Sequence, residues 1–157
     1  MSELMQAIYR GDQAHVEELL AAGPELDVFE AAAAGKADRL RGLLDEDPSL
    51  VNAWAEDGYQ PLGLASFFGH VEAARLLIER GAEIDSASRN DMKVMPLHSA
   101  AAADDPEMRY EIAKLLLEAG ADPNARQQDD FTPLMAADQS GDKRLAKLLE
   151  EHGATRD

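Results

Sequence analysis

Four histidines and one acidic cluster are the side chains of this 157-residue chain that are best suited to chemistry. Imidazole can act as a general base or bind a transition metal, and carboxylates close together can bind a hard cation. The cluster contains Asp104, Asp105, Glu107 and Glu111, whose three- and four-residue intervals place carboxylates on one face of a helix. The cluster and the histidines together suggest one catalytic alternative, a hydrolase or metal-dependent enzyme that uses Asp104, Asp105 and a histidine.

The spacing of these residues favours structural roles. His15, His70, His98 and His152 lie far apart in sequence, and no two have the separation of one helical turn that paired ligands on a helix need. We expect all four to have structural or surface roles, with His15 and His152 exposed. We therefore predict no metal site and no cofactor.

The acidic cluster also suits the start of a helix better than a cation. Asp105 precedes Pro106, which is the pattern of an N-cap followed by a first-turn proline, and Glu107 then complements the helix dipole. The sequence contains no G-x-S-x-G, P-loop or dinucleotide-binding glycine pattern. We predict that the protein is not an enzyme.

The net charge of −16 excludes several classes of partner. It repels nucleic acid phosphates and anionic lipid headgroups, so we expect neither nucleic acid nor membrane binding. Residues 1 to 57 hold 13 acidic and four basic residues, a net charge of −9. This excess suits either solubility or a basic partner. The absence of cysteine, of a leader pattern and of a long apolar run predicts a cytoplasmic protein.

The elements that must position these side chains are helices in a repeating unit. Alanine and leucine supply most of the apolar residues, and both favour helix. Glycine pairs recur twelve residues apart at Gly11 and Gly23, at Gly69 and Gly81, and at Gly141 and Gly153. Each pair brackets a leucine-rich helix that follows a shorter helix, in a unit of about 33 residues. One unit cannot bury its apolar face alone, so stacked units must share a continuous core.

Short motifs repeat in register with these units. Proline and leucine begin the first helix at Pro61-Leu62, Pro96-Leu97 and Pro133-Leu134, and Gly69-His70 forms a turn between helices. With the stretches GAEID and GADPN that end two units, these residues resemble ankyrin repeats. The uneven spacing between units indicates a natural sequence rather than a consensus design. The resemblance is to a small, bacterial-type member of the family, and it implies that His70 and His98 tie backbone segments together.

The resemblance implies an all-α solenoid of helix-turn-helix units in a right-angled stacked array, joined by β-hairpin-like fingers. We expect one domain, residues 1–157, with five repeats. They are an N-terminal capping repeat at 1–26, repeats at 27–57, 58–92 and 93–129, and a C-terminal capping repeat at 130–157. The charged last helix, which would discourage end-to-end stacking, predicts a monomer.

The resemblance also implies a binding surface, the concave groove formed by finger tips and the outward side of the first helices. It selects residues just before the proline-leucine start, just before the turn glycine and at the base of a finger. These are Trp54, Glu56, Asp57, Tyr59, Phe67, Phe68, Asp91, Met92, Val94, Arg126, Gln128, Asp129, Phe131 and Gln139. We expect one continuous groove that is wide and shallow at the second repeat, which offers only Ala33 and Ala34.

Four of the chain's eight aromatic residues, Trp54, Tyr59, Phe67 and Phe68, fall within fifteen positions. Aromatic residues dominate interface hot spots, so this cluster is the expected anchor of a protein partner. Packing of Trp54 and one phenylalanine between repeats is the alternative. We predict a non-catalytic protein-interaction module. A stoichiometric inhibitor or immunity-type protein that neutralises a basic enzyme is the second hypothesis.

Overall fold

The computed structural model describes residues 1–156, which form ten α-helices and two short 3-10 helices. The helices follow one another in pairs. The first helix of each pair is α1 (Glu3–Arg10), α3 (Val28–Ala34), α5 (Pro61–Phe67), α7 (Pro96–Ala101) or α9 (Pro133–Ser140). The second is α2 (Gln13–Ala21), α4 (Ala37–Glu46), α6 (Val71–Glu79), α8 (Pro106–Glu118) or α10 (Lys143–Glu151). The 3-10 helices are η1 (Pro48–Asn52) and η2 (Gln128–Asp130).

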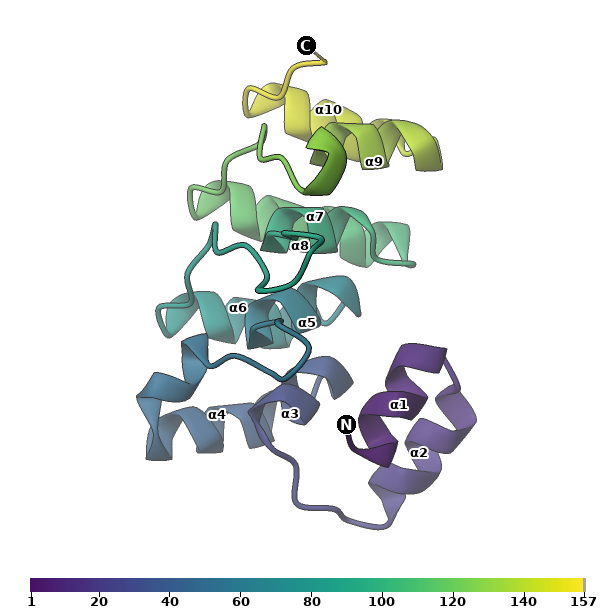
Figure 1. Ribbon diagram of the computed structural model, residues 1–157, viewed down its shortest axis with the longest axis vertical. Coiled ribbons are helices and arrows are strands. Elements are labelled where there is room, and N and C mark those ends of the chain that lie inside the picture. The colour runs from purple at the N-terminus through teal and green to yellow at the C-terminus, as the bar shows by residue number, and fades with distance from the viewer. Residues whose placement is uncertain (157) are drawn as a thin grey trace.

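The pairs from α3 to α10 stack along the long axis of the molecule (Figure 1). Each first helix contacts the first helix of the next pair, and the second helices do the same behind them. Alanines such as Ala65 and Ala100 are fully buried, and their small side chains let the first helices approach closely. Ten fully buried aliphatic side chains form the shared core: Leu40, Leu44, Leu62, Leu77, Leu97, Ile112, Leu116, Leu134, Leu145 and Leu149. The predicted all-α solenoid is confirmed.

Fingers project from the stack between successive pairs. Each finger is a turn closed by a backbone hydrogen bond, and the described residues contain no strand. The closing bonds run from Ala55 N to Tyr59 O at 2.8 Å, from Ser88 N to Val94 O at 2.8 Å and from Gln127 N to Phe131 O at 2.9 Å. Neighbouring fingers are also joined, through Arg89 N to Gly58 O and Gln128 N to Met92 O, both at 2.8 Å. The finger tips therefore form one hydrogen-bonded row.

Histidine ties the backbone of neighbouring units together, as predicted for two of the four. The Nε2 of His70, at the turn before α6, lies 2.9 Å from the carbonyl oxygen of Ala33 at the end of α3. Burial lowers the pKa of His70 below its ordinary value. The neutral ring therefore donates to this carbonyl and satisfies one of the free acceptors at the end of α3.

The first helix pair departs from the stack. α1 contacts α3, yet α1 and α2 lie beside the end of the stack at a steep angle to the other helices (Figure 1). A cleft of about 660 Å³ separates α2 from the start of α4, lined in part by Leu20, Leu26 and Lys36. The segment from Ala22 to Asp27 that joins the two pairs is too short for a finger, and the tilt carries α1 toward the finger side of α5.

No helix among residues 1–156 is long and apolar enough to cross a membrane.

Candidate functional site

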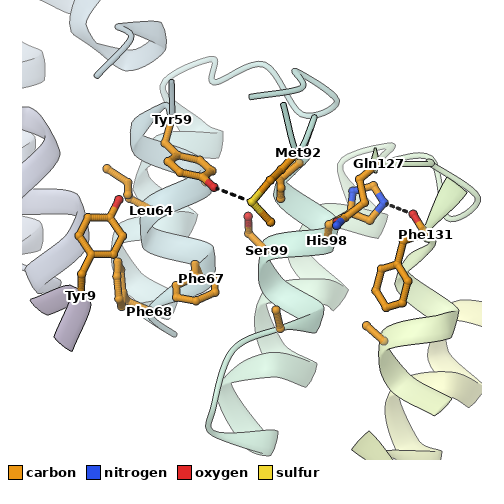
Figure 2. A pocket seen from close by; sticks show the side chains of 14 residues that line it. Tyr9, Tyr59, Leu64, Phe67, Phe68, Met92, His98, Ser99, Gln127 and Phe131 are labelled. Atoms are coloured by element: carbon orange, nitrogen blue, oxygen red, sulfur yellow. Dashed lines mark hydrogen bonds between the residues drawn. The ribbon is translucent and has the colours of Figure 1, made fainter. Parts of the chain in front are cut away.

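An apolar pocket of about 260 Å³ lies on the concave side, between the first helices and the fingers. Side chains from α1, α5, α7 and α9 meet residues of three fingers there (Figure 2). Its lining consists of Tyr9, Tyr59, Gly63, Leu64, Phe67, Phe68, Met92, Val94, His98, Ser99, Ala102, Gln127, Phe131 and Ala136. Segments up to 127 positions apart in the sequence thus build one site.

Three aromatic rings form one wall of this pocket. Phe68 lies edge-on to Phe67, with ring centroids 5.0 Å apart, and edge-on to Tyr9 at 5.5 Å. Phe67 remains 43% exposed, while Phe68 is half-buried and packs against the core. Adjacent positions at the end of α5 therefore divide two roles: Phe68 supports the wall and Phe67 presents its ring to the pocket. Edge-on pairs add about 0.5–1.5 kcal/mol beyond area burial, which holds the wall in place.

Tyr9 is held by a carboxylate on the next finger. Its hydroxyl donates to Oδ2 of Asp57 at 2.7 Å. Burial of the hydroxyl, and then the hydrogen bond to Asp57, raise the pKa of Tyr9 well above its ordinary value. The ring therefore closes the end of the groove beside the second repeat. Neither Ala33 nor Ala34 lines the pocket, so a wide, shallow groove beside the second repeat stays a prediction.

The opposite rim comes from finger tips. Met92 is 46% exposed, and its sulfur accepts from the hydroxyl of Tyr59 at 3.8 Å. Its backbone oxygen accepts from Gln128 N, so the tip that carries Met92 is fixed to the next finger. Phe131 closes that finger and lines the pocket at the end opposite the aromatic wall (Figure 2). The rim is thus anchored by backbone bonds although its side chains are exposed.

His98 forms part of the floor and has one possible tautomer in this network. It is 3% exposed. Its Nε2 lies 2.9 Å from the carbonyl oxygen of Ala125 and 3.1 Å from that of Phe131, so this nitrogen carries a hydrogen and donates. Its Nδ1 accepts from the backbone N–H of Met95 at 3.2 Å and therefore carries none. Burial lowers the pKa of His98, consistent with a neutral ring that supports the floor.

The structure brings six of the fourteen predicted binding residues into this pocket: Tyr59, Phe67, Phe68, Met92, Val94 and Phe131. Asp57 lies behind it as the partner of Tyr9. The exposed residues outside the pocket are Glu56, Asp91, Arg126, Gln128, Asp129 and Gln139. Arg126 donates to the backbone oxygen of Asp130 at 3.3 Å, within its own finger.

Trp54 lies apart from the pocket. The guanidinium of Arg89 stacks over its ring at 3.9 Å, and the ring borders a separate recess of about 10 Å³ beside Tyr59. The expected single cluster therefore contains Tyr59, Phe67 and Phe68 but not Trp54, because the cation–π contact uses the indole to join two fingers.

Sequence reasoning missed one wall residue and much of the floor. Tyr9 stands two residues before Gly11, just as Phe67 stands two residues before Gly69, so the same rule would have selected it. The floor residues Gly63, Leu64, His98, Ser99 and Ala136, and Gln127 on a finger, carry no such signal. Their contribution depends on how neighbouring units are packed.

Asp105 of the acidic cluster has a structural role. Asp105 caps α8, with its Oδ1 accepting from Glu107 N at 2.9 Å and Met108 N at 3.4 Å, as predicted. Residues 1–156 contain no group of three or more histidine and acidic side chains placed to hold a metal ion. The pocket itself is lined mostly by aliphatic and aromatic groups, and such a surface binds by excluding water.

A family model described as "Ankyrin repeats (3 copies)" matches residues 4–127. The last helix pair, α9 and α10, lies beyond this match but continues the same stack. Ankyrin repeats are a generic protein–protein interaction module.

Several known proteins are similar in sequence. A putative ankyrin repeat-containing protein of Treponema pallidum is 34% identical over 122 residues, which covers 71% of this chain and 39% of the relative. Ankyrin repeat and SAM domain-containing protein 6 of Mus musculus is 32% identical over 127 residues, covering 78% of this chain and 14% of the relative. A putative ankyrin repeat protein of Fowlpox virus is 33% identical over 133 residues, covering 82% and 28%. The chain thus spans less than half of each of these relatives. The repeat motifs, the stacked helix pairs and these matches agree, and the chain belongs to the ankyrin repeat family.

Proposed function

We propose that this chain is a non-catalytic module that binds a protein partner through its concave groove and finger tips. The observation that carries the proposal is the gathering of exposed apolar side chains at one pocket. Tyr9 is 38% exposed, Phe67 43% and Met92 46%, and all three border the same cavity. Exposed large apolar residues that cluster in a concavity with a polar rim are typical of interface centres.

The packing of the site supports recognition by a preformed surface. The aromatic wall, the finger row and the floor are each fixed by contacts within the protein, through Phe68, Met92 O and His98 respectively. A partner would therefore meet side chains that have already lost much of their freedom, which reduces the entropic cost of binding.

Capture of partners from extracts of the source cell tests the proposal. Wild-type protein, the Tyr59→Ala/Phe67→Ala double variant and Tyr110→Ala would be used as baits. Tyr110 is a matched aromatic control on α8, where its ring packs against the guanidinium of Arg144 at 3.8 Å outside the pocket. We expect the double variant to lose a partner that wild type and Tyr110→Ala both retain. Equal capture by all three baits would contradict the proposal.

The second hypothesis, an inhibitor or immunity-type protein for a basic enzyme, is a narrower form of the same function. The net charge of −16 favours it. Its association with the enzyme would slow steeply as salt rises, whereas a rate indifferent to salt would count against it.

We also propose that the five helix pairs are five repeats of one cytoplasmic, monomeric domain. The exposed charges of α10 at the end of the stack, such as Lys143, Lys147 and Glu151, support the monomer. Sedimentation equilibrium would test it.

A further inference from the structure

The size of the pocket suits side chains of a protein partner. Pockets that enclose drug-sized ligands usually measure about 300–1,000 Å³. This one measures about 260 Å³ and opens on the concave side between helices and fingers. One or two bulky apolar side chains would fill it, in the manner of anchor residues at an interface centre.

The hydrogen-bonding groups of the site favour a helix over an extended peptide. A strand adds to an exposed sheet edge, but residues 1–156 contain no strand. The Tyr9 hydroxyl donates to Asp57, and the His98 Nε2–H donates to the carbonyls of Ala125 and Phe131. These donors are therefore not available to the backbone of an extended peptide. A helix satisfies its own backbone and needs only apolar surface.

The charge of the finger tips indicates which side chains the polar face of that helix carries. Glu56, Asp91, Asp129 and Asp130 are exposed on the three tips that border the pocket. Three cations lie on the same tips, Arg89, Lys93 and Arg126. Arg89 stacks over Trp54, and Arg126 donates to the backbone oxygen of Asp130. The rim is thus acidic in excess, within a chain whose net charge is −16. Lysine and arginine on a partner would be attracted to it.

We propose that the pocket binds a cationic amphipathic helix of a partner protein, with apolar anchors one turn apart inserted between Phe67 and Phe131. Lysine or arginine side chains of that helix lie against the acidic tips. Tyr9 sets the size of the anchor by closing the pocket at its first-repeat end. This inference rests on the proposed function and names the chemistry of the partner.

Selection from a random peptide library displayed on phage tests the inference with the full chain as bait. We expect enriched peptides to carry apolar residues at three- or four-residue intervals and a net positive charge. Phe67→Glu, verified as folded by circular dichroism, should fail to bind them. Enrichment of acidic peptides, of peptides without apolar residues, or of peptides that bind Phe67→Glu equally well would overturn the inference.

A charge-matched pair of variants then tests the acidic tips. The tip variant is Glu56→Gln/Asp91→Asn/Asp129→Asn/Asp130→Asn. The control is Glu17→Gln/Glu46→Gln/Glu79→Gln/Glu118→Gln, which removes the same charge from exposed positions on the second helices. We expect the tip variant to weaken binding of the enriched peptides about tenfold and the control to weaken it by much less. Equal weakening by both would overturn the role of the tips.

The two proposals fail in different ways. If no peptide is enriched while a native partner depends on Tyr59 and Phe67, the helix is wrong and the interaction function stands. If capture of native partners is the same with and without these rings, the interaction function itself is wrong.

Discussion

The hydroxyl of Tyr9 on the first helix donates to the carboxylate of Asp57 at 2.7 Å, across 48 positions of sequence. The bond joins the tilted α1 to the first finger, and the ring above it packs edge-on against Phe68. A repeat that would otherwise serve only to end the stack therefore supplies one wall of the pocket. The boundary of the site depends on a contact between the first repeat and the finger of another.

Tyr9→Phe should separate the hydrogen bond from the ring. The variant leaves the Asp57 oxygen without its donor, so we expect the free energy of unfolding to fall by about 1 kcal/mol. The retained ring should preserve binding. Urea denaturation measures the change, with Tyr110→Phe as a control that should alter stability little. A Tyr9→Phe protein as stable as wild type would show that the bond does not hold α1.

His98 predicts a dependence of stability on pH. Because burial lowers its pKa in the folded protein from the ordinary value of 6.5, the unfolded chain binds the proton more readily. The contribution of the neutral His98 ring to the free energy of unfolding is complete above pH 6.5, and it is lost as the pH falls toward the pKa of the folded state. His70 shifts in the same direction, so the two effects add. We expect the free energy of unfolding to fall as the pH decreases below 6.5.

The tautomer gives an independent check of His98. The backbone N–H of Met95 already donates to Nδ1. A proton on Nδ1 would therefore lie against the hydrogen of that N–H, which disfavours protonation. Nitrogen NMR of the ring should show the Nε2–H form persisting below pH 6.5. A His98 ring that titrates at or above 6.5 would contradict this account.

Ser66→Ala should stabilise the protein. Ser66 is fully buried in α5, and its hydroxyl has no hydrogen-bond partner among the described residues. Burial of an unpaired hydroxyl is unfavourable, and alanine also favours helix, so we expect a gain of about 1 kcal/mol. Ser140→Ala is the control, because that exposed hydroxyl donates to the carbonyl of Ala137 at 3.2 Å. A loss of stability in Ser66→Ala would reveal a partner for its hydroxyl.

Gly58→Ala and Gly81→Ala should differ although both residues have φ of 91°. Left-handed backbone costs alanine about 1–2 kcal/mol at either position. A Cβ at Gly58 would also lie 2.5 Å from the carbonyl oxygen of Arg89, whereas one at Gly81 meets nothing within 4 Å. We expect Gly58→Ala to cost a further ~1–3 kcal/mol and to disturb the finger row. Equal losses of stability would mean that the fingers adjust freely.

Local patterns were sufficient to predict most of the architecture. Pro96 and Pro133 begin helices, and Gly11 and Gly141 end them in the left-handed conformation, as their chemistry requires. The resemblance assigns both Phe67 and Phe68 to the binding surface, whereas Phe68 packs against the core and Phe67 stays exposed, because neighbouring positions on a helix point about 100° apart. These features depend on a few adjacent residues, and the register of the repeats determines where they lie in the stack.

Features that depend on contacts between residues far apart in the sequence were harder to predict. The tilt of α1 accompanies a short connection and the contacts of Tyr9 to Asp57 and Phe68, and no local pattern specifies these contacts. The position of Trp54 depends on Arg89, which lies on the next finger and stacks over the indole. Apolar character alone cannot distinguish a ring that faces a groove from one that joins two fingers.

The affinity of a captured partner for three forms of the protein tests the central claim most directly. Isothermal titration would compare wild type, Tyr59→Ala/Phe67→Ala and Tyr110→Ala, each verified to have wild-type helicity and a similar melting temperature. We predict that the double variant binds at least about 30-fold more weakly, since hot-spot aromatics contribute about 2 kcal/mol or more, and that Tyr110→Ala binds like wild type. A double variant that folds and binds the partner with wild-type affinity would contradict the assignment of the pocket as the binding site.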